Sequence, residues 1–77
     1  MGEQFDLYTE MVTMPDGEVF VIEARRPKLG AGDSLVVVRS LVGLPRWREV
    51  LDHHADLDAR VTEIADDLRE GRWPASA

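Results

Sequence analysis

The stretch SLVVVRSLVG, residues 34–43, decides the fold because its first half has no polar side chain on either face of an extended strand. Side chains alternate between the two faces of a strand, so Leu35 and Val37 point to one side and Val36 and Val38 to the other. A chain of 77 residues has room for one long helix, which can cover one face of a sheet. The question that follows is what covers the second face.

A hairpin precedes this strand. In MPDGE, residues 14–18, Pro15 presets the φ angle of a turn, Asp16 can accept a hydrogen bond from the backbone two residues on, and Gly17 tolerates a positive φ. Apolar and β-branched residues flank the turn on both sides, which is typical of two strands joined by a short loop.

These signals predict three consecutive antiparallel strands. The second strand is expected to end where Pro27 removes a backbone donor, and a connection with two glycines leads to the third. Strands joined by short connections usually pair in chain order, as a meander. We expect strands over residues 5–14, 18–26 and 34–42.

The rest of the chain predicts a long amphipathic helix over residues 45–70. Pro45 suits the first helical position, and Gly71 followed by a proline suits a C-terminal cap. Apolar residues recur at steps of three and four, provided that His54 fills one position of the stripe. The stripe consists of Trp47, Val50, Leu57, Val61, Ile64 and Leu68.

Asp56 offers an alternative helix start, so the helix is either continuous or broken near residues 53–56. Residues 73–77 are expected to form a flexible tail. The predicted fold class is therefore α+β, a single small domain over 1–77 with a three-stranded antiparallel meander followed by one helix.

The geometry of these elements predicts association. A continuous helix of about 26 residues would span roughly 39 Å and overhang strands of about 27 Å. With both faces of the central strands apolar, one face would stay exposed in a monomer, and such patches mark interfaces. We expect a homodimer or another protein partner, the alternative being that the first strand and the tails cover the second face. The candidate residues for the core or for the interface, which the sequence does not separate, are Val19, Val21, Val36, Val38, Leu57, Val61, Ile64 and Leu68.

The charges argue against nucleic acid as the default partner. The net charge is −6, and residues 49–77 carry three basic against eight acidic side chains. An alternative is a nucleic-acid-binding regulator that lays its sheet in a groove. Its basic patch would consist of Arg25, Arg26, Lys28 and Arg39, with Arg46 and Arg48 nearby. Equally, these arginines could pair with Glu23, Glu18 and Glu49 across strands.

A weaker alternative is a metal site in LDHHADLD, residues 51–58. On a helix, His54 and Asp58 would lie one turn apart, beside His53, and imidazole and carboxylate both bind divalent cations. Two or three ligands from one segment do not complete a site. Packing of His54 within the apolar stripe, with His53 facing solvent, accounts for the same residues.

Other functional classes lack their motifs. There are no cysteines, so thiolate metal sites and cysteine nucleophiles are excluded. Neither a phosphate-binding loop nor a nucleophile elbow is present. The longest apolar runs have four residues, far short of a membrane-spanning helix. We therefore expect a cytoplasmic protein that is not an enzyme, with no cofactor, no small-molecule ligand and no membrane contact.

Overall fold

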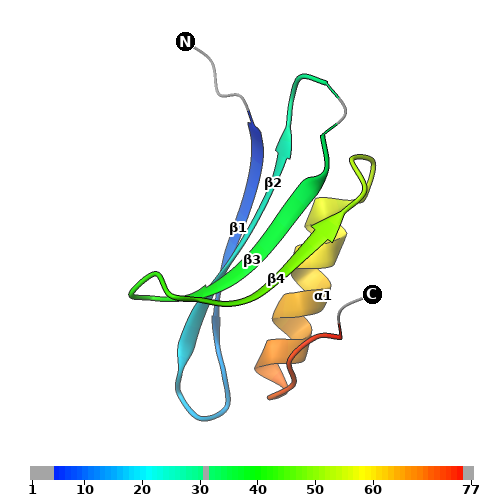
Figure 1. The fold of residues 1–77 in the computed structure, drawn as a ribbon. Coiled ribbons are helices and arrows are strands. Elements are labelled where there is room, and N and C mark those ends of the chain that lie inside the picture. Colours follow the sequence, from blue (N-terminus) through cyan, green and yellow to red (C-terminus); the bar gives the residue numbers. More distant parts are fainter. Residues whose placement is uncertain (1–4, 31, 76–77) are drawn as a thin grey trace.

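The computed structural model describes residues 5–30 and 32–75 (Figure 1). It contains one antiparallel sheet in the strand order β1-β2-β3-β4, with a single helix packed on one face, which confirms the α+β class. The elements are β1 (Phe5–Thr13), β2 (Val19–Pro27), β3 (Ser34–Ser40), β4 (Pro45–Leu51) and α1 (Leu57–Arg69).

The predicted first hairpin is confirmed: β1 and β2 are joined by a turn formed by the residues that the sequence indicated. Gly17 has a φ of 92° and donates its N–H to the carbonyl of Met14 over 2.9 Å. The carboxylate of Asp16 accepts a hydrogen bond from the N–H of Glu18 at 2.9 Å. Because the turn closes tightly, β1 and β2 pair along their whole length.

The prediction of three strands is wrong, because residues 45–51 form a fourth strand instead of the first turns of the helix. The chain reverses just before it. Gly43 adopts a φ of 92° and donates to the carbonyl of Ser40, while the N–H of Ser40 donates to the carbonyl of Leu44. This second hairpin returns the chain alongside β3, and Pro45 is tolerated because it opens an edge strand.

The helix begins at Leu57, twelve residues later than the predicted start at residue 45. Asp56 is the N-cap, and its carboxylate accepts a hydrogen bond from the N–H of Ala59 at 3.1 Å. The alternative start at Asp56 is therefore confirmed, but the segment before the break is a strand and not a first helix. At 13 residues α1 spans about 20 Å and does not overhang the sheet.

The last residue of α1 is Arg69, and the helix is terminated at Gly71 as predicted. Gly71 has a φ of 83°. Its N–H donates to the carbonyl of Leu68 at 3.0 Å, and the N–H of Arg72 donates to the carbonyl of Asp67 at 2.9 Å. These two bonds are the Schellman pattern, which satisfies carbonyls that the helix leaves unpaired.

The core lies between α1 and one face of the sheet. Of the predicted apolar stripe, Leu57, Val61, Ile64 and Leu68 lie on α1 and are buried against the sheet, whereas Trp47 and Val50 belong to β4. The core residues are Val12, Phe20, Ile22, Ala24, Val36 and Val38 from the sheet and Leu57, Val61, Ile64, Ala65 and Leu68 from the helix.

Residues 73–75, expected within a flexible tail, lie against the body of the domain. The ring of Trp73 meets that of Phe20 edge-on at 5.2 Å between centroids, and Pro74 is buried. Arg60 donates to the carbonyl of Ala75 at 3.2 Å. The last part of the expected tail, 76–77, lies outside the described residues.

The cap of α1 gives a direct test of its boundary. Replacing Asp56 with Ala removes the acceptor for the N–H of Ala59, and we expect a loss of about 1 kcal/mol in the free energy of unfolding. Asp56→Asn keeps an acceptor and serves as the control. Urea unfolding followed by circular dichroism measures both, and equal stabilities of the two variants would contradict the assignment.

Candidate functional site

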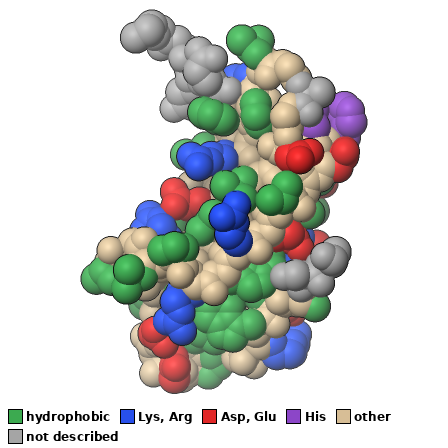
Figure 2. Space-filling view, viewed as in Figure 1, with side chains coloured by type: hydrophobic (Ala, Val, Ile, Leu, Met, Phe, Trp, Pro, Cys, Tyr) green, Lys and Arg blue, Asp and Glu red, His purple; other side chains and the backbone are tan. Residues whose placement is uncertain are grey.

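The face of the sheet opposite α1, called here the open face, carries exposed apolar side chains. On the edge strand β1, Leu7 and Met11 are 55% and 63% exposed, and on the other edge strand β4, Val50 is 56% exposed. Alternation places them opposite Val12 and Glu49, which point toward α1. Figure 2 shows hydrophobic side chains next to basic ones across the visible surface.

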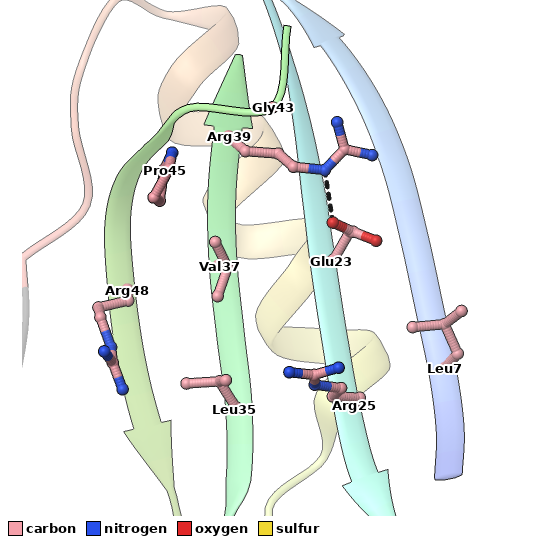
Figure 3. Close-up of a pocket in the computed structure, with 9 residues that line it drawn as sticks. All are labelled: Leu7, Glu23, Arg25, Leu35, Val37, Arg39, Gly43, Pro45 and Arg48. Carbon is pink, nitrogen blue, oxygen red and sulfur yellow. Dashed lines mark hydrogen bonds and ion pairs between the residues drawn. The ribbon is translucent and has the colours of Figure 1, made fainter. Parts of the chain in front are cut away.

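A groove of about 500 Å³ crosses this face (Figure 3). Its floor is apolar, formed by the half-buried Leu35 and Val37 of β3, with Leu7 on β1 and Pro45 on β4 at its sides. Nine residues line it, namely Leu7, Glu23, Arg25, Leu35, Val37, Arg39, Gly43, Pro45 and Arg48. The groove therefore combines apolar contact area with charged groups from three of the strands.

Two of the charged residues in the groove, Arg39 and Glu23, form an ion pair with each other and so neutralise each other's charge. The Nε of Arg39 donates to the carboxylate of Glu23 over 2.5 Å, between neighbouring strands (Figure 3). Arg25 instead places its guanidinium over the ring of Phe5, at 5.7 Å from the centroid. Over the described ranges 5–30 and 32–75, neither Arg25 nor Arg48 forms an ion pair with a carboxylate.

Near the groove, the β3–β4 hairpin carries further apolar side chains. Leu41, Val42 and Leu44 are 58%, 83% and 64% exposed, and the hairpin projects to one side of the sheet in Figure 1. Gly43 and Pro45 line the groove itself, so the apolar surface continues from the groove to this hairpin.

The residues predicted for the core or the interface divide between the two faces. Val19 and Val21 lie on the open face, where Val21 is 7% exposed. The other six belong to the core, namely Val36, Val38, Leu57, Val61, Ile64 and Leu68. The sequence did not indicate Leu7 and Met11 as residues of an interface. It indicated that Leu35 and Val37 share one face of a strand, but it placed Arg48 beside the basic patch and Val50 in the helix stripe.

The basic residues predicted as one patch do not share a surface. Arg25 and Arg39 lie on the open face, but Arg26 points to the opposite side. There it donates to the carbonyl of Ala55 at 3.2 Å and lies 3.5 Å from the carboxylate of Asp6. Lys28 follows β2 and is exposed. Nucleic-acid binding stays a prediction, carried by fewer cations than the sequence indicates.

The alternative of pairing across strands holds for two of the three glutamates. Glu23 pairs with Arg39, and Glu18 lies 3.6 Å from Arg46. Glu49 instead faces α1, where it is only 8% exposed. Its carboxylate accepts two hydrogen bonds from Arg60, from Nε at 2.8 Å and from Nη2 at 3.1 Å. The hydrogen bond raises the pKa of Arg60, and the negative charge of Glu49 adds to this effect, so the guanidinium stays charged throughout the neutral range.

This ion pair ties β4 to α1. Replacing Arg60 with Leu leaves the Glu49 carboxylate buried without its partner, and we expect destabilisation by about 3 kcal/mol. The double variant Glu49→Leu/Arg60→Leu removes both charges and should lie closer to the unchanged protein. Thermal and urea unfolding of the set measure this, and a double variant less stable than Arg60→Leu would contradict the account.

The histidines lie in a turn before α1, so the one-turn spacing of His54 and Asp58 on a helix is wrong. The N–H of His54 donates to the carboxylate of Asp52 at 2.9 Å, and Nδ1 of His53 lies 2.8 Å from the carbonyl of Gly32. In the part of the chain that the structure describes, no group of three or more His, Asp or Glu side chains is placed to hold a metal ion.

Comparison with known proteins adds no function to this geometry, since no family model, curated protein or solved structure matches the chain. Of the elements in the described residues, none is a helix with the length and apolar character needed to cross a membrane. The open face is the feature from which a function can be argued.

If the open face serves binding, its side chains should contribute little to folding. Leu7→Gln is expected to change the free energy of unfolding by about 0.5 kcal/mol or less, because Leu7 is already 55% exposed. Ile64→Ala, on the core face, is the comparison and should cost about 2–5 kcal/mol. Chemical unfolding of both variants decides the point, and a large loss for Leu7→Gln would make the open face structural.

Proposed function

We propose that this protein is a small interaction module that binds a second polypeptide on the open face of its sheet. The observation that carries the proposal is the set of exposed apolar side chains opposite α1, Leu7 and Met11 on β1 and Val50 on β4. Exposed apolar side chains gathered on one face, with polar residues between and around them, mark binding sites in soluble domains.

Two further features support this function. Leu35 and Val37 give the groove a half-buried apolar floor that a partner would bury completely. The exposed apolar residues of the β3–β4 hairpin lie beside that floor and extend the contact area. In a domain this small, association also supplies stability that the core cannot.

The partner is either a second copy of the chain or a different protein. A homodimer is the commonest assembly of soluble proteins and would bury the same face of both copies. A partner of different sequence satisfies the same apolar requirement. Both are forms of one function, which is recognition through the open face.

Site-specific crosslinking in the cells that make the protein tests this function. A photoreactive residue at Val50, on the open face, should give discrete adducts, because a bound partner covers this position. The same residue at Thr62, exposed on α1, is the matched control and should give none of them.

The variant Leu7→Asp, which introduces a charge on the same face at an edge strand, should remove the Val50 adducts without unfolding the protein. Circular dichroism confirms the fold of each variant. Identical adducts from both positions, or adducts at Val50 that persist in Leu7→Asp, would contradict binding through the open face.

A further inference from the structure

We propose that the occupant of the open face is an acidic amphipathic helix of another protein, with Arg25 and Arg48 each binding a carboxylate beside its apolar stripe. This inference rests on the proposed function, since it names the partner of the same face.

The two cations flank the apolar floor of the groove. In the sheet register, Arg25 on β2 lies beside Leu35, and Arg48 on β4 lies beside Val37 (Figure 3). Because β2 and β4 are separated by β3, their backbones are two strand spacings apart, about 10 Å. A helix with side chains is about 10–12 Å across, so carboxylates on both flanks of its apolar stripe match this spacing.

The charge of the groove is opposite to that of the chain. Its lining has three arginines and one glutamate, a net +2, whereas the whole chain carries −6. Glu23 is already paired with Arg39. Within residues 5–30 and 32–75, therefore, two guanidinium groups at an apolar groove are left for carboxylates from outside. Arginine also suits the bidentate recognition of a carboxylate.

A second copy of the chain fits this groove poorly. Packing two open faces about a two-fold axis would bring two copies of Arg25 and two of Arg48 into one interface, and like charges there are unfavourable. The chain's own acidic helix cannot serve either, because Val61, Ile64 and Leu68 of its apolar stripe are already buried in the core. Docking α1 of one copy on the next would also give an open chain of subunits.

The groove favours a helix over a strand or a nucleic acid. It lies on the face of the sheet, between the two edge strands, where no backbone groups are free to pair with an added strand. Its apolar floor offers nothing to phosphates, and the net charge of −6 repels a polyanion. On the other face, α1 already demonstrates that a helix packs across this sheet.

A displayed library of helical peptides, about 18 residues or five turns long, tests the inference on the purified protein. Each peptide has an apolar stripe, with Glu, Gln or Lys at the positions that flank it. We expect selection of Glu on both flanks, and the best peptide should bind about tenfold more tightly than its Lys counterpart in fluorescence anisotropy.

Charge-reversal variants test whether the preference for Glu comes from the arginines of the groove. Arg48→Glu should shift the selected residue on one flank from Glu to Lys and weaken the original peptide about tenfold. Lys28→Glu makes the same change of charge outside the groove and should select the same peptides as the unchanged protein. Circular dichroism verifies that both variants fold.

The remaining outcomes separate this inference from the proposed function. Selection of no peptide, of peptides without charge preference or of Lys-flanked peptides overturns the acidic partner. Tighter binding of duplex DNA, or a dimer in sedimentation velocity that Leu7→Asp dissociates, overturns it as well. In each case Val50 adducts that Leu7→Asp abolishes would leave recognition through the open face standing, whereas their persistence would remove both.

Discussion

A single helix of 13 residues can cover one face of a four-stranded sheet, and the rest of the structure depends on this limit. Burial of apolar surface is the main stabilising term, and the hydrophobic core cluster lies in the layer between α1 and the sheet. The chain has no second helix in the described residues with which to cover the other face. That face keeps apolar side chains but intersperses them with Glu23, Arg25 and Arg39, which limits the contiguous apolar area.

The first hairpin and the C-terminal helix cap could be predicted from the sequence, and Asp56 could be named as an alternative helix start, because each depends on local chemistry. Asp16 and Gly17 determine a turn, Asp56 offers an acceptor to the first turn of α1, and Gly71 permits the positive φ that ends it. Such signals need no tertiary partner. Turn and cap residues can therefore be identified from the sequence alone.

The fourth strand could not be predicted, because its pattern depends on a distant residue. Residues 45–51 alternate between the two faces, but the middle position on the core face is Glu49, and a charged residue there hides the alternation. Trp47 and Val50, three apart, fit a helix equally well. Only the pairing of Glu49 with Arg60, eleven residues away, explains why a carboxylate is buried on this face.

The existence of the open face could be predicted from the sequence, but its residues could not. Apolar side chains on both faces of the central strands indicated that one face of the sheet would stay uncovered, but not which face α1 would cover. The signal in the sequence that could have identified the open face is that the charged residues Glu23, Arg25 and Arg39 all point to it.

The two sides of the domain carry charge of opposite sign, so they act differently on an approaching charged partner. The exposed side of α1 carries Asp58, Glu63 and Asp66, whereas the groove on the opposite side has a net positive charge. An acidic partner approaching α1 is repelled, and one approaching the groove is attracted, so the field favours the orientation in which the apolar surfaces can meet. Charge would then select the partner and its orientation, while Leu35 and Val37 supply the contact that holds it. The same net charge of −6 that argues against a polyanion is compatible with an acidic helix, because Arg25 and Arg48, which form no ion pair within residues 5–30 and 32–75, both line the apolar groove.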